Sequence, residues 1–361
     1  MKKIALVMGF AVLMCAVAVS CKKDNNENNE QNSLAKDIVA AEEGTHARYI
    51  YILNEGVWGG NDASLDRITV PTGEYQSDVF AKNNGRGLGD VANDIQIYGS
   101  KMYIVVNNSN IVEVLDPDNA RSVRQIQLAG KQPRYLAGHA GYVYVTCFSD
   151  EVVKIDTATL SVVATCNVGR DPEMMVVVGD TLYTVNSGGL DNPNYDSTVS
   201  VVDLATFTEV RKINVGMNPT KMVRIDDNRL MVVCNGNYVS VPSSLVVIDL
   251  DVERVTRLPF TCTNLTIAGN YAYCYDFDWS ANTAVFYRIN LGTFTKESFT
   301  LNGSNGIVCP YSITVNKDNG NIYITDSQNF ISSGDIYCFS SAGAKLYKCG
   351  CGMGPSKVVM W

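Results

Sequence analysis

The sequence contains little charge and almost no histidine. Charged residues make up 18% of the 361 residues, which is below the roughly 25% of an average soluble protein, while 46% of the residues are hydrophobic. This balance excludes long disorder for most of the chain. The two histidines, His46 and His139, are too few for a multi-histidine metal centre, and they leave little material for a hydrolase that depends on an imidazole.

An excess of basic residues is also missing. Lys and Arg together number 29 against 37 Asp and Glu, which gives a formal net charge of −8. Because binding to phosphate backbones depends on clustered positive charge, we expect no nucleic-acid partner. The chain also lacks a glycine-rich phosphate loop that opens a helix, and it lacks a G-x-S-x-G nucleophile motif.

Carboxylates are present, but not in a pattern that identifies a reaction. Two pairs are candidates for glycoside hydrolysis, Asp276 with Asp278 and Glu55 with Asp62, and neither has a distinguishing sequence context. Asp276, Asp278 and Asp326 offer oxygen ligands for a calcium ion, a weaker alternative because they lack the spacing of a dedicated calcium loop. We therefore predict a non-enzymatic protein that requires no cofactor and has no metal site.

An apolar run at the N-terminus predicts export. Lys2 and Lys3 precede an apolar segment over residues 4–19, which is shorter than the roughly 20 residues of a membrane span. The segment ends at Ala18-Val19-Ser20-Cys21, which resembles the lipobox of bacterial lipoproteins. Residues 1–20 are therefore predicted to be a lipoprotein signal peptide, and Cys21 is predicted to be lipidated. An ordinary cleaved signal peptide with a chance Cys is the alternative.

Residues 21–48 are predicted to form a flexible polar tether. From Lys22 to Ala47 the chain has no aromatic residue and too few apolar residues to offset the entropy of ordering. The acidic, Asn-rich composition just after Cys21 resembles the sorting segment that sends some lipoproteins of Gram-negative bacteria to the outer face of the outer membrane. A plain flexible spacer is the alternative.

An internal repeat covers the remaining chain. Each unit has a Pro or its substitute, an apolar run, a Gly-rich turn, a Tyr-x-Val-like segment that ends in Asn or Asp, and then V-x-D-x-x-T. Two independent anchors both give seven units. The first anchor falls at Tyr51, Tyr103, Tyr144, Tyr183, Met231, Tyr273 and Tyr323, and the second at Thr69, Asp116, Asp156, Asp203, Asp249, Asn290 and Ser340. A period of about 40 to 50 residues with about four short β-rich segments is typical of a β-propeller blade.

We therefore predict an all-β, seven-bladed β-propeller over residues 49–361. The repeated aspartates precede Thr-rich turns in several units, which favours a structural role as turn caps over a catalytic or metal-binding role. The chain ends predict how the ring closes. Segments 49–53, 63–70 and 74–80 supply the second, third and fourth strands of a blade that lacks its first strand, and residues 355–361 repeat the opening of a blade. We expect residues 355–361 to pair beside residues 49–54, which satisfies backbone groups at an otherwise open edge.

The repeated motifs resemble a known family. G-x-x-P followed by Tyr-x-Val-x-Asn and V-x-D-x-x-T is similar to the YVTN or YncE-like propeller family. A narrower resemblance, to surface propeller lipoproteins of the BtuG type, rests on Leu53-Asn54-Glu55-Gly56, Ala63-Ser64-Leu65, Leu88-Gly89-Asp90-Val91-Ala92 and Val106-Asn107-Asn108-Ser109. That family captures cobalamin and delivers it to a TonB-dependent outer-membrane transporter. The resemblance thus implies a corrinoid ligand and such a transporter as a partner.

One face of the propeller carries the candidate site. In a four-stranded blade, the loop that enters the first strand and the loop between the second and third strands emerge on the same face. These loops carry aromatic residues among Asn, Gln and Ser, which suits a large amphipathic ligand. For a corrinoid, the rings would lie under the ligand and the amides would meet its amide side chains. The predicted ligand-binding residues are Asn54, Trp58, Asn107, Arg134, Tyr135, Asn186, Asn192, Tyr195, Tyr238, Phe277, Trp279, Tyr311, Gln328 and Phe330, with Lys221 and Lys357 on the entering loops.

The cysteines do not define a framework. Nine of the eleven lie beyond the signal segment and Cys21, and they lack the paired C-x-x-C motifs of zinc or redox sites. Cys147, Cys234 and Cys274 occupy strand positions where a small hydrophobic residue would serve. Buried free thiols and one or two disulfides both fit this pattern.

The sequence as a whole predicts a lipid-anchored protein of the outer membrane, exposed at the cell surface, that binds an extracellular ligand without changing it chemically. A corrinoid is the leading ligand. The alternatives are a protein- or glycan-binding scaffold and a propeller lyase or glycosidase. Because propellers serve all of these roles, the fold does not choose among them.

Overall fold

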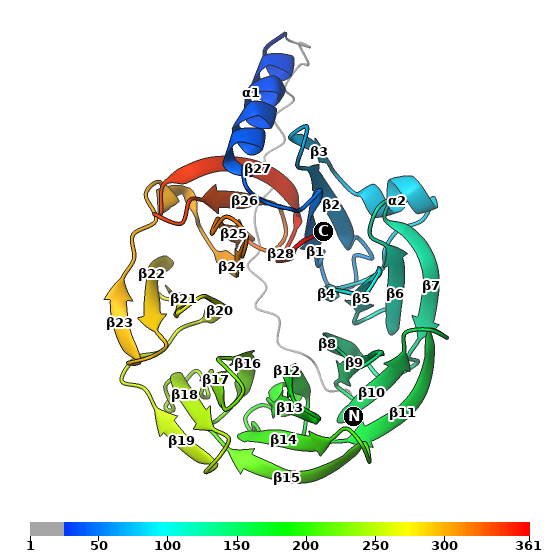
Figure 1. Cartoon of the computed structure of the whole chain (residues 1–361), viewed down its shortest axis with the longest axis vertical. Coiled ribbons are helices and arrows are strands. Elements are labelled where there is room, and N and C mark those ends of the chain that lie inside the picture. The colour runs from blue at the N-terminus through cyan, green and yellow to red at the C-terminus, as the bar shows by residue number, and fades with distance from the viewer. Residues whose placement is uncertain (1–24) are drawn as a thin grey trace, which may run out of the picture.

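The computed structural model describes residues 25–361, and the predicted signal peptide and Cys21 lie outside this range. The described strands form seven four-stranded antiparallel sheets, which surround a central axis like the blades of a propeller (Figure 1). The prediction of an all-β, seven-bladed β-propeller is confirmed.

Each blade runs from an inner strand at the axis to an outer strand at the rim. The blades consist of β28 (Pro355–Met360), β1 (Tyr49–Asn54), β2 (Ser64–Thr69) and β3 (Glu74–Gln76); β4 (Ala92–Tyr98), β5 (Lys101–Val106), β6 (Ile111–Asp116) and β7 (Arg121–Gln127); β8 (Pro133–His139), β9 (Tyr142–Cys147), β10 (Glu151–Asp156) and β11 (Ser161–Asn167); β12 (Pro172–Val178), β13 (Thr181–Asn186), β14 (Thr198–Asp203) and β15 (Thr208–Asn214); β16 (Pro219–Arg224), β17 (Arg229–Cys234), β18 (Ser244–Asp249) and β19 (Arg254–Arg257); β20 (Asn264–Ala268), β21 (Tyr271–Asp278), β22 (Thr283–Asn290) and β23 (Thr295–Ser298); and β24 (Pro310–Val315), β25 (Ile322–Asp326), β26 (Ser333–Phe339) and β27 (Lys345–Met353).

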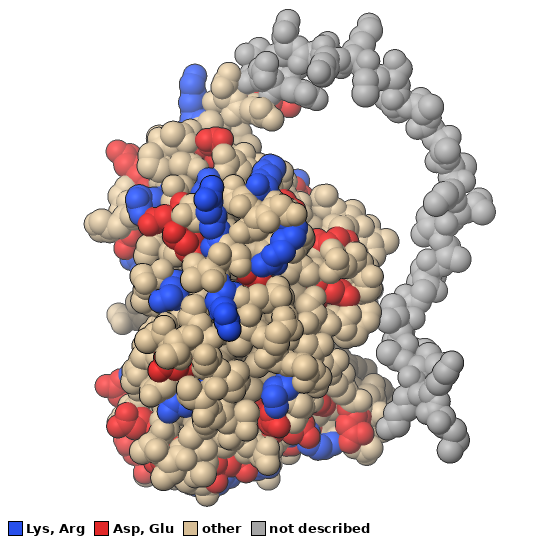
Figure 2. Space-filling model, turned by 90° about the vertical axis from the view of Figure 1, so that its right-hand side faces the viewer, with Lys and Arg blue, Asp and Glu red and all other residues tan. Residues whose placement is uncertain are grey.

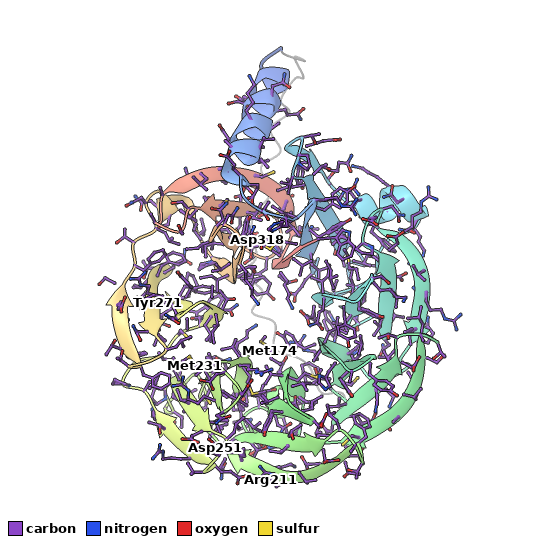
Figure 3. The ribbon with its side chains drawn as sticks, in the orientation of Figure 1. Met174, Arg211, Met231, Asp251, Tyr271 and Asp318 are labelled. Atoms are coloured by element: carbon purple, nitrogen blue, oxygen red, sulfur yellow. The ribbon has the colours of Figure 1, made fainter. Side chains whose placement is uncertain are left out.

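The strand sequences follow their position in the blade. In the second strands, for example β9, five consecutive residues are buried because neighbouring blades cover both faces. The outer strand β15 buries only Ile213 and leaves the rest at least partly exposed. Apolar clusters fill the spaces between blades: Tyr103 and Val105 of β5 pack in one cluster with Val143 of β9. Figure 3 shows the same gradient, with Met174 near the axis and Arg211 at the rim.

The ring closes as predicted. Strand β28 pairs antiparallel with β1, and Ile52 lies opposite Val358. Beyond the strand, the backbone N–H of Trp361 donates to the carbonyl of Tyr49 at 2.9 Å, and the Trp361 indole donates to Asp118 at 2.8 Å. The C-terminal strand therefore supplies the missing inner strand of the N-terminal blade.

The prediction of a flexible tether does not hold over α1 (Asn25–Ala41), which is helical. Ile38 is fully buried, and Leu34 and Ala41 pack against the same apolar cluster. These residues recur at the spacing of one helix face. After the helix, the buried Glu42 carboxylate accepts hydrogen bonds from the hydroxyls of Tyr323 at 2.7 Å and Tyr347 at 3.1 Å. Within the described residues, no helix has the length and apolarity needed to cross a membrane.

A second helix shortens a predicted strand. Of residues 74–80, only Glu74–Gln76 form β3, and α2 (Val79–Asn84) follows. The Asp78 side chain caps this helix by accepting from the backbone N–H of Ala81 at 3.1 Å. Val79 and Phe80 are buried, so the segment leaves the sheet to cover the side of its blade. Two single-turn 3-10 helices, η1 (Gly189–Asp191) and η2 (Ser304–Gly306), lie in loops.

The repeated aspartates act as turn caps, as predicted. The Asp156 carboxylate accepts from the backbone N–H groups of Ala158 and Thr159, and the Asp203 carboxylate accepts from that of Thr206. All nine cysteines of the described residues are free and buried. On the side of the molecule seen in Figure 2, basic and acidic side chains are interspersed over the surface.

Candidate functional site

The antiparallel blades give the propeller two different faces. The loops between second and third strands, and the connections from each outer strand to the next inner strand, lie at one end of the axis. We call this end the loop face and the opposite end the turn face. Helix α1 packs against the outer strand β27, and the segment after it reaches the turn face, where the backbone N–H of His46 donates to Asp318 in the β24–β25 turn.

The loop face exposes large apolar side chains. Trp279 is 64% exposed and Tyr238 is 68% exposed, and both lie on loops between second and third strands. Trp58, Leu190 and Ile331, on three further loops of this kind, are also exposed. Because a monomer rarely presents such residues together without a partner or ligand, their placement on one face indicates a binding surface.

Aromatic rings on this face contact one another in sequence. The Phe277 ring lies edge-on to Trp279 at a centroid distance of 4.7 Å, and Trp279 stacks on Phe330 at 6.5 Å with 22° between the planes. Phe330 in turn meets Tyr311 edge-on at 5.2 Å. We call Phe277, Trp279, Phe330 and Tyr311 the aromatic row. It leads from the exposed Trp279 to Tyr311 on the inner strand β24.

A groove separates the aromatic row from the neighbouring blade. Its volume is about 510 Å³, within the roughly 300 to 1,000 Å³ of small-molecule sites. Trp279 and Phe277 form one wall, and the loop around Tyr238 and Val241 forms the other. Tyr238 is supported by the edge of Tyr195 at 6.3 Å, so aromatic side chains stand on both sides of the groove.

The centre of the loop face is an opening of about 240 Å³, which the inner strands line with both polar and apolar side chains. The Glu55 carboxylate in this opening accepts from the Tyr311 hydroxyl at 2.6 Å and from the Asn93 amide at 2.8 Å. Burial raises the pKa of Glu55, although these two hydrogen bonds act in the opposite direction. The buried Asn93 Oδ1 atom has no hydrogen-bond partner among the described residues.

A buried ion pair stands beside this opening. Arg134 donates to both oxygens of the Glu173 carboxylate, with a shortest distance of 3.0 Å. The guanidinium also lies over the Phe148 ring, 4.5 Å from its centroid. Burial raises the pKa of Glu173 and the charge of Arg134 opposes this shift. The Nε and Nη2 groups of Arg134 bond to Glu173, so this guanidinium serves mainly to neutralise a buried carboxylate next to the opening.

Lys221 lies where the groove meets the central opening, since it lines both. Its ammonium donates to the Tyr135 hydroxyl at 3.2 Å. Burial lowers the pKa of Lys221, but Tyr135 and the charge of Glu173 outweigh burial, so the pKa is raised and the side chain stays charged. A second lysine, Lys357, is paired with Asp94 at 2.5 Å.

Three of these central residues share one position in the repeat. Arg134, Glu173 and Tyr311 each directly follow a proline that begins an inner strand. The ladder is irregular there, for example between Pro172 and Met175 of β12, which turns the following side chains toward the opening. Glu55, Asn93 and Glu173 were not among the predicted site residues, although their place at the starts or ends of strands next to the axis was readable from the repeat.

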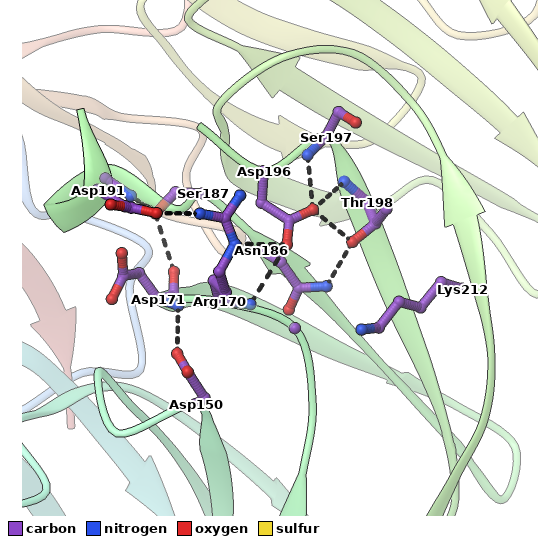
Figure 4. Close-up of polar contacts among 12 residues, drawn as sticks. Asp150, Arg170, Asp171, Asn186, Ser187, Asp191, Asp196, Ser197, Thr198 and Lys212 are labelled. Atoms are coloured by element: carbon purple, nitrogen blue, oxygen red, sulfur yellow. Dashed lines mark hydrogen bonds and ion pairs between the residues drawn. The ribbon is translucent and has the colours of Figure 1, made fainter. Parts of the chain in front are cut away.

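The β13–β14 loop is held by polar contacts (Figure 4). The Asp196 carboxylate accepts from the backbone N–H groups of Ser197 and Thr198, and Arg170 pairs with Asp191 at 2.5 Å. The Asp171 carboxylate accepts from the backbone of Leu190. This network fixes Tyr195, whereas Asn192 remains exposed at the loop tip.

Three predicted amides are buried inside the blades, which corrects the sequence-based interpretation. Asn54 donates to Asp66 at 2.9 Å, Asn107 to the carbonyl of Pro133 at 3.1 Å, and Asn186 to Ser200 at 2.8 Å. Each side chain is at most 1% exposed. These amides do not reach the surface. They donate hydrogen bonds to buried acceptors near the strand ends, which would otherwise lack partners.

The other predicted residues are distributed unevenly. Gln328 is half-buried and donates to both Asp326 and Asp335 at 2.9 Å, so its amide nitrogen is occupied. Trp58 lies on the β1–β2 loop, and no aromatic ring of the described residues contacts it. The structure thus brings together Tyr195, Tyr238, Phe277, Trp279, Phe330, Tyr311, Tyr135 and Arg134 around the groove and opening.

The carboxylate pairs considered from the sequence have local partners. Asp62 accepts from the backbone of Val57 at 2.8 Å, and Asp278 accepts from Ser280 and Ala281 in its own turn. Burial raises the pKa of Asp276, a carboxylate that lines the groove. No group of three or more metal-ligating side chains occurs in the part of the chain that is described.

Comparison with known proteins places the chain in a family. The model of the family described as "Domain of unknown function (DUF5074)" matches residues 49–256, more than half of the chain. The chain therefore belongs to this family. No curated protein matches the sequence.

Three solved structures with a similar fold are distant in sequence. A quinoprotein alcohol dehydrogenase-like protein of Bacteroides thetaiotaomicron matches with a TM-score of 0.63 and 16% identity over 87% of this chain and 78% of its own. Hydrazine synthase of Kuenenia stuttgartiensis matches with 0.58 and 17% over 69% and 76%, and the computationally designed Ika8 protein with 0.56 and 12% over 88% and 98%. At these identities the likeness concerns the fold alone.

Proposed function

We propose that this DUF5074 protein is a non-enzymatic binding protein that captures a corrinoid on its loop face. The observation that carries the proposal is the aromatic row beside the central opening that holds Glu55 and Asn93, on a face that exposes Trp279 and Tyr238. Flat rings with exposed faces contribute apolar contact area at a low cost in rotamer entropy. A corrinoid is flat and apolar at its centre and has amide groups at its periphery, which suits this combination.

The central opening supplies a place for one peripheral amide. Asn93 Oδ1 is buried without a hydrogen-bond partner among the described residues, and the Glu55 carboxylate lies beside it. An acceptor without a partner is costly when buried, so a ligand N–H at this position would be favoured. A carboxamide of the ligand provides such a donor.

The proposal extends to the location. A lipidated Cys21 would anchor the chain in the outer membrane, and a TonB-dependent transporter would receive the ligand. The N-terminal segment enters the propeller through the turn face, by way of Glu42 and His46. Entry at that end leaves the loop face free for ligand and transporter.

Calorimetric titration of cyanocobalamin tests the proposal on the chain from Lys22 onward, which retains every described residue. We expect one-to-one binding that weakens about tenfold in Trp279→Ala, because about 1.4 kcal/mol of contact energy is lost. Val285→Ala, at an exposed position on β22, is the matched control and should bind as the wild type does. Absence of heat at micromolar protein would reject the corrinoid and favour a glycan or protein ligand.

A further inference from the structure

Lys221 has hydrogen-bonding capacity that the protein does not use. An ammonium group has three donors, and the only hydrogen-bond acceptor that the described residues offer to Lys221 Nζ is the Tyr135 hydroxyl. The side chain is half-buried, so access of water to the remaining donors is restricted. A partly desolvated ammonium in this state favours a further acceptor.

The other charged groups at the opening are already paired. Arg134 forms a two-pronged ion pair with Glu173, and Lys357 forms one with Asp94. Glu55 is occupied by the Tyr311 hydroxyl and the Asn93 amide. Lys221 is therefore the cation of this opening that forms no ion pair with a described carboxylate.

The position of Lys221 also sets the shape of a complementary ligand. The residue lines the groove together with Phe277, Trp279 and the carboxylate of Asp276, and it lines the central opening together with Glu55. A molecule seated against the rings would thus have one end at the ammonium. A complementary ligand therefore combines a flat, apolar body with an oxygen acceptor at its edge.

We propose that the loop face binds amphipathic anions, with the flat apolar part in the groove beside Trp279 and an anionic oxygen on the ammonium of Lys221. The inference rests on the proposed function in one respect, namely that the loop face is the binding face, and it adds the charge of the ligand. Charge-assisted hydrogen bonds of this kind are stronger than neutral ones, and shielding from water preserves their strength.

Two fluorescent dyes of similar shape test the inference independently of the natural ligand. Anilinonaphthalene sulfonate has flat rings and a sulfonate, and N-phenylnaphthylamine has the same rings without the anion. We expect Lys221→Met to weaken the sulfonate dye about tenfold and to leave the neutral dye unchanged. Lys221→Arg should restore binding of the sulfonate dye. Lys317→Met, which removes an exposed lysine from the turn face, is the matched control and should leave both dyes unaffected.

The outcomes separate this inference from the proposed function. Equal weakening of both dyes by Lys221→Met, or no weakening of the sulfonate dye, would overturn the anion site, and so would failure of the wild type to bind either dye. A melting temperature close to that of the wild type is required of each variant. Sulfonate-dye binding that depends on Lys221 but is not displaced by cyanocobalamin would uphold the anion site and reject the corrinoid.

Discussion

The closure of the ring offers a quantitative test at Val358. This residue is 2% exposed, lies opposite Ile52 in β1, and packs in one apolar cluster with Ile50. Val358→Ala removes two methyl groups, worth about 1.6 kcal/mol at roughly 0.8 kcal/mol each. With a partly unfilled cavity, we expect the free energy of unfolding to fall by about 2 kcal/mol. That is a large part of the roughly 5 to 15 kcal/mol of a typical domain.

Urea unfolding measures this loss. The midpoint should fall while the dependence of the unfolding free energy on urea concentration stays constant, because the surface exposed on unfolding is nearly the same. Val252→Ala, the same substitution at a residue that is 64% exposed, should change stability by less than about 0.5 kcal/mol. If Val358→Ala behaved like Val252→Ala, residues 355–361 would not be packed against β1 in solution, and the reasoning on closure would be refuted.

Three further results are expected. Glu42→Ala should lower the free energy of unfolding by about 2 to 3 kcal/mol, because the buried hydroxyls of Tyr323 and Tyr347 lose their acceptor; Glu42→Gln, which keeps an acceptor, should cost less in the same urea assay. Because the pKa of Glu55 is raised in the folded state, ionisation of this residue destabilises the fold. The free energy of unfolding therefore falls as the pH rises from the ordinary pKa of 4.5 through the folded-state pKa. The melting temperature of Glu55→Gln relative to wild type should therefore increase with pH, and a constant difference would contradict this assignment. An aromatic disulfide reagent should leave the nine buried thiols unlabelled in the native protein and label them after denaturation, so rapid native labelling would count against the packing described.

The fold could be predicted because the same sequence pattern occurs seven times along the chain. Seven similar segments specify seven similar blades, and the truncated first unit requires a strand from the far end, as β28 provides. Helix α1 could not be predicted from composition, since its docking depends on Leu34, Ile38 and Ala41 alone. The contacts of these three residues, together with the hydrogen bonds of Glu42 to two tyrosines, hold the helix in place although the segment as a whole is polar.

The candidate site was predicted in part. Loop position identified the exposed rings of Trp279 and Tyr238, whereas Phe277 lies within β21 and belongs to an apolar core cluster. The same criterion failed for Asn54, Asn107 and Asn186, which lie at the ends of their second strands and bond to buried groups of the propeller. The exposed aromatic side chains point to the surface and the three asparagine side chains point into the blades, and the sequence repeat alone does not give this direction.

Amide hydrogen exchange with and without saturating cyanocobalamin tests the central claim, that the loop face binds the ligand, most directly. We expect slower exchange in the loops over residues 235–243, 279–282 and 327–332, and unchanged exchange in the turn-face segments 225–228 and 250–253. Protection confined to the turn face, or no protection at all, would contradict the claim.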